Sequence, residues 1–189
     1  RDAVGDKFGL FPQSLCDSEW VMGRRVGEWL LKVADSSPDG RVELLYDYGA
    51  DIELLVGVLE ECNLWPKVRL VAGERNIGAE TGTIGPELAS EAAFSAMRRR
   101  QPALYRHHAL ADALALRAGW RTWHLAHERA ADFLQLLRVV GDSQEGWLYQ
   151  WLASPAPALG GIEPLDVLDQ AGGLQVAVDA LHRIEGGCA

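Results

Sequence analysis

The sequence contains few cysteines, and none of them are spaced as a metal site or a disulfide framework requires. Its 189 residues include Cys16, Cys62 and Cys188, which is an odd number at wide spacing. No Cys-x-x-Cys pair occurs, so the pattern indicates neither a structural zinc site nor a set of disulfides. We expect the thiols to be reduced or buried, as in a cytoplasmic protein.

Long apolar runs are also missing. No run approaches the roughly 18 residues that a membrane-spanning helix needs. The opening residues, RDAVGDKFG, lack the apolar centre of a signal peptide. Hydrophobic residues make up 48% of the chain and charged residues 24%, which are ordinary values for a folded protein. The sequence therefore predicts a folded cytoplasmic protein without a membrane segment, of one large or two small domains.

Positive charge is scarce and unevenly distributed in a chain of net charge −9. Residues 97–129 contain seven arginines and two acids, whereas residues 141–189 contain seven acids and Arg183 alone. An acidic C-terminal part is suited to docking onto a basic cleft of a partner protein. The alternative is that the acids only confer solubility.

The first part of the chain alternates between helical and strand-like patterns. Apolar spacing predicts a helix over residues 18–33 and another over residues 51–62. Short apolar runs bounded by turn residues predict strands at 41–48 and 67–72. A strand, a helix and a strand within this length indicate a βαβ unit with parallel pairing.

The second part of the chain shows helical patterns alone. Residues 76–85 are rich in Gly and Thr and predict a loop, and residues 119–189 predict an all-α domain. We therefore place a domain boundary between an α/β part, residues 1–118, and this helical part. The predicted helices of the second half cover residues 86–100, 108–118, 122–140, 144–153, 165–168 and 174–184.

Three short motifs occur in order near the C-terminus. They read WLASPAPALGG at 151–161, EPLDVL at 163–168 and HRIEGG at 182–187. Their order and spacing resemble the toxin-binding domain of the Xre/MbcA/ParS antitoxin family. The resemblance covers the chain from about Trp147 onward and extends more weakly back to Thr122.

The resemblance implies a partner protein, a RES-type toxin that degrades NAD, and no cofactor. In that family the C-terminal segment enters or covers the active-site cleft of the toxin. Self-association of the chain is left open, and so is a purely structural role for these residues. The candidate partner contacts are Arg183, Ile184, Glu185, Gly186 and Gly187, while Leu159, Gly160, Gly161 and Pro164 are expected to shape the domain.

One departure from the family concerns DNA. These antitoxins usually carry a helix-turn-helix before the toxin-binding domain. Residues 1–118 show strand patterns and no convincing helix-turn-helix. The sequence therefore gives no support for autoregulation by DNA binding.

A second resemblance lies before the helical part. Residues 107–113, HHALADA, are similar to the last motif of DEDDh 3′–5′ exonucleases. The resemblance would make His107 the general base and Asp112 a metal ligand. Asp51, at a helix start after a strand, would be a further metal ligand, and Asp47 is a weaker alternative for this role. Such sites hold two Mg²⁺ or Mn²⁺ ions that activate water and stabilise the leaving oxygen.

The first exonuclease motif is not in its usual context. An Asp-x-Glu pair should lie on an opening strand, but Asp17-Ser18-Glu19 starts a predicted helix. Residues 1–118 are therefore interpreted as an RNase H-like remnant, degenerate or lacking its first motif. The alternative function is a metal-dependent 3′–5′ exonuclease acting on nucleic acid, and a chance occurrence of HHALADA is left open.

Overall fold

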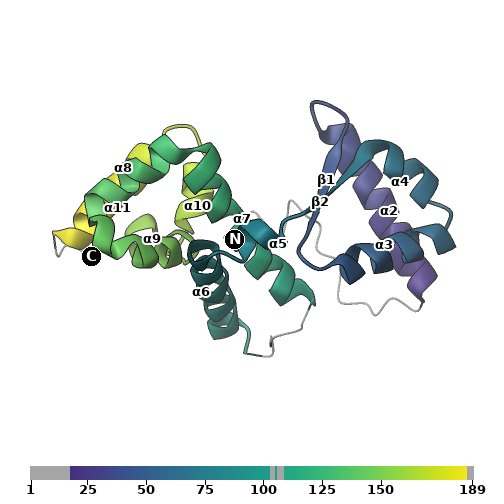
Figure 1. Cartoon of the computed structure of the whole chain (residues 1–189), viewed down its shortest axis with the longest axis horizontal. Coiled ribbons are helices and arrows are strands. Elements are labelled where there is room, and N and C mark those ends of the chain that lie inside the picture. Colours follow the sequence, from purple (N-terminus) through teal and green to yellow (C-terminus); the bar gives the residue numbers. More distant parts are fainter. Residues whose placement is uncertain (1–17, 103–104, 106–108, 187–189) are drawn as a thin grey trace. The chain divides into compact units, whose positions relative to one another are not determined.

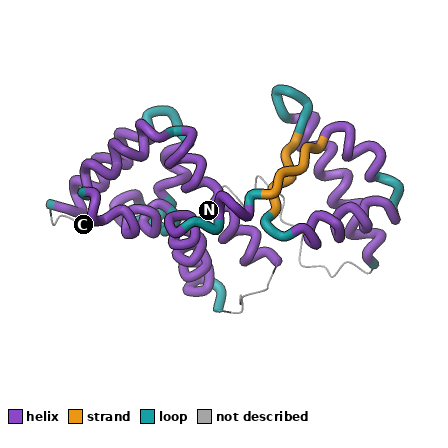
Figure 2. The backbone as a smooth tube through the Cα atoms, in the orientation of Figure 1, coloured by secondary structure: helices purple, strands orange, loops and turns teal. Residues whose placement is uncertain are grey.

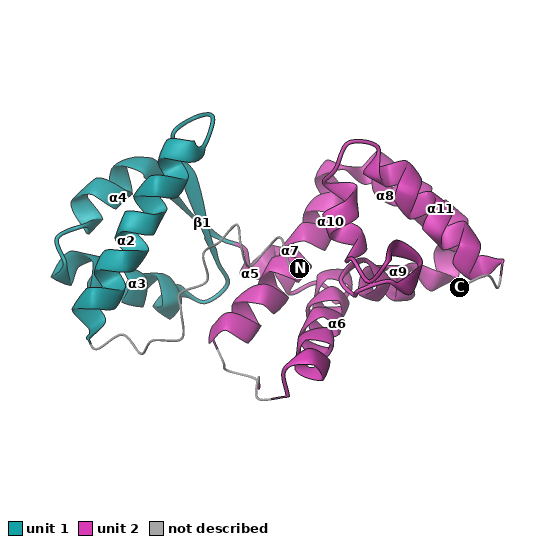
Figure 3. Cartoon of the chain, turned by 180° about the vertical axis from the view of Figure 1, so that it is seen from behind, with its two compact units in different colours: residues 1–76 teal, residues 77–189 magenta. Residues whose placement is uncertain are grey.

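The structure, a computed structural model, describes residues 18–102, 105 and 109–186. The chain divides into two compact units, residues 1–76 and residues 77–189 (Figure 3). Among the described residues, none of the helices is both long and apolar enough to cross a membrane. Each unit is described by itself.

Unit 1 combines helices with a small sheet (Figure 1). The first helix starts at Ser18, whose hydroxyl accepts a hydrogen bond from the Val21 N–H at 3.3 Å. This is the usual way in which serine caps a helix. The elements are α2 (Glu19–Ser36), β1 (Val42–Tyr46), α3 (Gly49–Glu61), α4 (Trp65–Val71) and β2 (Ala72–Asn76).

The two strands of unit 1 lie side by side and pair in parallel, which confirms the predicted parallel orientation (Figure 2). The predicted strand at 67–72 is wrong, because most of these residues belong to α4 and β2 begins only at Ala72. Pro66 lies in the first turn of α4, where proline favours a helix start. Val68 then points inward and is fully buried. A short apolar run does not by itself distinguish a strand from a helix.

The core of unit 1 depends on a close approach of α2 to its neighbours. Leu30, Leu59 and Val68 form the buried cluster. A Cβ on Gly27 would lie 2.6 Å from Cδ1 of Leu64 and 2.9 Å from Cδ2 of Leu59. Glycine at this position of α2 therefore allows the helix to pack directly on these leucines.

The described residues of unit 2 form helices joined by turns and loops, with an isolated bridge between Ala156 and Ile162 and no strand. This confirms the all-α character predicted for the C-terminal part. The expected loop at 76–85 contains a short helix. The elements are α5 (Gly78–Thr81), α6 (Ile84–Arg100), α7 (Ala109–Glu128), α8 (Ala130–Val140), η1 (Asp142–Gln144), α9 (Glu145–Leu152), η2 (Pro157–Leu159), α10 (Pro164–Leu168) and α11 (Gly173–Glu185).

The position expected for the domain boundary lies inside α7. This helix continues from Ala109 to Glu128. It ends before Arg129, which is the N-cap residue of α8. Gly119 lies within this helix and does not interrupt it. Its lack of a side chain allows close contact with α6, because a Cβ there would lie 3.0 Å from the carbonyl oxygen of Pro86. The division between the two compact units lies after Asn76 and not at residue 118.

One continuous core unites the helices of unit 2. Small residues of α6 and α7 pack with larger apolar residues of α8 to α11. Small side chains permit close helix contacts, and the larger ones fill the remaining volume. The buried cluster includes Ala89, Ala93, Ala118, Leu125, Phe133, Leu136, Leu148, Leu152, Leu165, Leu168, Ala177 and Leu181.

This core generates a prediction about stability. Leu181 on α11 is fully buried at 0% exposure, so Leu181→Ala should lower the free energy of unfolding by about 2–5 kcal/mol. Val176 on the same helix is 47% exposed, so Val176→Ala should change it by about 0.5 kcal/mol or less. Urea unfolding followed by circular dichroism measures both. Equal losses for the two variants would contradict this description of the core.

Candidate functional site

A closed loop connects α9 to α10. The Ala156 N–H donates to the Ile162 carbonyl at 3.1 Å, and the Gly161 N–H donates to the Ala156 carbonyl at 2.9 Å. Gly160 and Gly161 have φ angles of +68° and +82°, a conformation that glycine adopts without strain. Ala156 is buried, whereas Gly160, Gly161 and Ile162 are exposed. The loop therefore presents its glycine turn and an isoleucine side chain to solvent.

The last turn of α11 lies beside this loop. The Arg183 guanidinium donates through Nη2 to the Ala158 carbonyl at 3.1 Å and through Nε to the Asp179 carbonyl at 3.3 Å. Arg183 and Glu185 are exposed, while Ile184 is half-buried and packs against the core. The helix end is thus fixed to the loop and still accessible.

The structure brings together most of the residues that the sequence suggested as partner contacts. Arg183, Ile184 and Glu185 lie in the last turn of α11, and Gly186 caps it. Leu159, Gly160 and Gly161 belong to the loop that Arg183 contacts through the neighbouring Ala158. Pro164 is buried at the start of α10, and Gly187 lies outside the described residues.

An ionic bridge joins α7 to α10. Arg121 reaches from α7 with Nη1 2.8 Å from Oδ1 of Asp166 and Nη2 2.8 Å from Oδ2 of Asp169. The Arg121 side chain is only 15% exposed. Its planar guanidinium has the two donors that such a double contact requires. The bridge fixes α10, and the closed loop leads directly into this helix.

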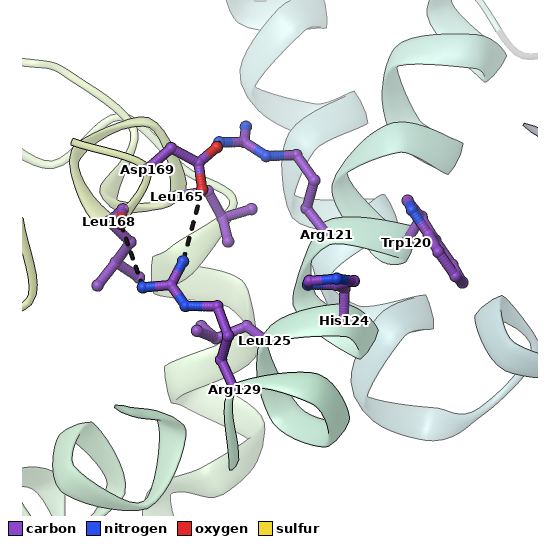
Figure 4. Close-up of a pocket in the computed structure, with 8 residues that line it drawn as sticks. All are labelled: Trp120, Arg121, His124, Leu125, Arg129, Leu165, Leu168 and Asp169. Carbon is purple, nitrogen blue, oxygen red and sulfur yellow. Dashed lines mark hydrogen bonds and ion pairs between the residues drawn. The ribbon is translucent and has the colours of Figure 1, made fainter. Parts of the chain in front are cut away.

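A second arginine strengthens the same contact. Arg129 donates to the Leu168 carbonyl at 3.2 Å, and its Nη1 lies 3.6 Å from Asp169. It also pairs with Asp132 at 2.8 Å. Figure 4 shows the guanidinium groups of Arg121 and Arg129 around Asp169. The C-terminal end of α10 is thereby attached to the junction of α7 and α8.

The ionic bridge changes the interpretation of the charge pattern. Asp166 and Asp169 are two of the seven C-terminal acids, and arginines of the same chain neutralise them. Part of the negative charge of the C-terminal residues is therefore paired with arginines of the same unit. Asp142, Glu145, Asp179 and Glu185 remain exposed.

A groove of about 270 Å³ lies between α7 and α10. Trp120, His124, Leu125 and Leu165 line it together with the arginines of the bridge (Figure 4). The Trp120 and Trp123 rings stack along α7 with centroids 5.0 Å apart. Trp120 and Trp123 therefore pack on each other along α7.

The sequence contained a signal for this bridge that its motifs did not reveal. Arg117 and Arg121 are four residues apart and share a helical face, and Asp166 and Asp169 are three apart. The pattern predicts two matching charged faces but not that they meet. The contact spans 45 residues of sequence between Arg121 and Asp166.

Glu163 occupies the N-cap position of α10 and is half-buried. Burial raises the pKa of its carboxyl above the usual value, and the negative charge of Asp166 raises it further. Arg121, Arg117 and Arg100 act in the opposite direction without cancelling the shift. The ionised form of Glu163 is therefore disfavoured in the folded protein.

The residues suggested for a nuclease site are not assembled in either unit. Asp51 is exposed in the first turn of α3 in unit 1, and Asp112 is half-buried in the first turn of α7 in unit 2. His107 lies outside the described residues. Within the part of the chain that the structure describes, no group of three or more His, Cys, Asp or Glu side chains could hold a metal ion.

Comparisons with known proteins find similarities for the helical end of the chain. Residues 135–187 match the family of the antitoxin Xre/MbcA/ParS C-terminal toxin-binding domain. The chain is 49% identical over 41 residues to the Prs ADP-ribosylating antitoxin of Sphingobium sp. (strain YBL2). This region is 22% of the chain and 26% of the relative, so the chain spans about a quarter of that protein's length. No solved structure matches the chain significantly.

These findings support an antitoxin role for the C-terminal part. The matched residues run from within α8 to just beyond α11 and include both the closed loop and the ionic partners on α10. The exonuclease-like interpretation of residues 1–118 gains nothing from them and stays a prediction.

The raised pKa of Glu163 generates a pH-dependent prediction. Between the ordinary pKa and the raised one, the folded state holds the proton more tightly, so stability falls as the pH rises through that interval. Glu163→Gln removes this penalty. The variant should match the wild type at about pH 4 and be more stable at about pH 7.5, as measured by urea unfolding. A constant difference between the two proteins at both pH values would contradict the assignment.

Proposed function

We propose that this chain is an antitoxin that binds and neutralises a RES-type, NAD-degrading toxin through its C-terminal helical domain. The observation that carries the proposal is the hydrogen bond from Arg183 to Ala158, which joins the end of α11 to the glycine loop in one exposed surface. Both segments lie in the part that matches the toxin-binding family.

The geometry suits insertion into a cleft. The end of a helix is narrow, and here its last turn carries the exposed Arg183 and Glu185. The loop beside it is held by two backbone hydrogen bonds around Ala156, so little conformational freedom is lost on binding. The surface is preorganised for a partner with a concave site.

The charge of this surface fits a cleft that binds NAD. The pyrophosphate of NAD is anionic, so a protein site that holds it presents cations or backbone N–H groups. Glu185 offers a carboxylate to such groups, and Asp179 is exposed nearly two turns earlier on the same helix. An acidic helix end would occupy the site in place of the pyrophosphate.

The similarity to the Sphingobium protein supports an antitoxin role and a link to NAD chemistry. The name of that relative describes the antitoxin itself as ADP-ribosylating, and NAD is the donor of the group transferred in ADP-ribosylation. An enzyme that degrades NAD begins by binding it. The partner we propose is therefore an enzyme with an NAD-binding cleft.

Co-expression tests the proposal directly. The chain is produced together with a candidate RES-domain toxin, and growth, cellular NAD and co-purification are measured. We expect restored growth, preserved NAD and a stable complex. A toxin that stays active and purifies alone would refute the proposed function.

The surface itself is tested by reversing one charge. Arg183→Glu removes the bond to Ala158 and places a carboxylate against that carbonyl oxygen, so the end of α11 should separate from the loop and the Kd for the toxin should rise about 10- to 100-fold. Arg138 is an exposed arginine on α8. The matched control Arg138→Glu should bind like the wild type in isothermal titration calorimetry. Equal affinity of the two variants would show that α11 does not form the contact.

A further inference from the structure

The toxin-binding family matches residues 135–187, but the folded unit that contains them begins earlier. Helices α6 and α7 precede the matched segment and contribute to the same buried core. On α7, Ala118 is 6% exposed and Leu125 is 2% exposed. The matched helices are therefore packed on residues that the family similarity does not include.

The dependence is strongest for α10. This helix has only five residues, which is too short for a helix to be stable by itself. Its apolar side, Leu165 and Leu168, joins the shared core, and its acidic side is held by Arg121 and Arg129. Tertiary contacts from α7 and its end thus keep α10 in place.

The position of α10 in turn determines the geometry of the loop. Only Glu163 separates Ile162, which closes the loop, from Pro164, the first residue of α10. At its other side the loop contacts Arg183 through Ala158. A shift of α10 would therefore pull the glycine turn away from the end of α11.

We propose that Arg121 is a positioning residue for partner binding, which clamps α10 so that the glycine loop and the end of α11 form one surface. The inference rests on the proposed function. It extends the functional domain upstream of residue 135 to include α7. Arg121 acts through Asp166 and Asp169, and direct contact with the partner is not required.

Three variants of the full chain test the clamp against the toxin that the wild-type chain binds. Arg121→Met keeps a long side chain and removes both ion pairs, so its Kd should rise about 3- to 30-fold. Arg121→Lys keeps the charge but cannot hold two carboxylates in the same way, so it should fall between the wild type and the Met variant. The control Arg138→Met lies within the family-matched segment and should bind like the wild type.

Hydrogen exchange separates positioning from general destabilisation. In Arg121→Met the amides of residues 157–168 should exchange faster, while those of α8 and α11 keep the wild-type rate. Uniformly faster exchange across unit 2 would overturn the inference in favour of a merely structural role. Unchanged toxin affinity of Arg121→Met would also overturn it while leaving the proposed function intact. Failure of the wild-type chain to bind any RES-type toxin would instead refute the proposed function, and this inference with it.

Discussion

The double ion pair of Arg121 with Asp166 and Asp169 is the contact on which the C-terminal surface depends. The Arg121 side chain in this contact is only 15% exposed, and without it the two acids would keep only the longer contacts of Arg117 with Asp166, at 4.0 Å, and of Arg129 with Asp169, at 3.6 Å. The double ion pair holds a five-residue helix that could not persist alone. Through this helix it fixes the glycine loop, and Arg183 then joins the loop to the end of α11. Electrostatics inside unit 2 thus prepares the surface proposed to meet another protein.

Much of the fold followed from local patterns in the sequence. The apolar spacing on α2, the turn residues before β1 and the parallel pairing of the strands were predicted correctly. The strand expected at 67–72 was wrong, because Pro66 starts a helix and the burial of Val68 stabilises it. The boundary placed at residue 118 lies inside α7, and the compact units divide after Asn76. Pro66 is a local signal for the start of α4, whereas the division of the units depends on tertiary packing, which a pattern along the chain does not contain.

The candidate site was only partly visible in the sequence. The motifs around Gly160 and Arg183 mark two segments that lie side by side in the structure, although no pattern showed that Arg183 reaches the Ala158 carbonyl. In the sequence, Arg121 is one of the arginines of an arginine-rich stretch and belongs to none of the motifs. Its partners lie 45 and 48 residues away, and this distance in sequence explains why spacing rules did not reveal the bridge. The nuclease site stays a prediction. Asp51 and Asp112 belong to different units, and His107 lies outside the described residues.

The central claim is that the helical end of this chain occupies the NAD-binding cleft of a toxin. The most direct measurement is NAD consumption by the purified RES-type toxin while the chain is added in increasing amounts. We expect the rate to fall to zero once the toxin is saturated, and a higher NAD concentration to relieve part of the inhibition. An unchanged rate at saturating amounts of the chain would contradict it.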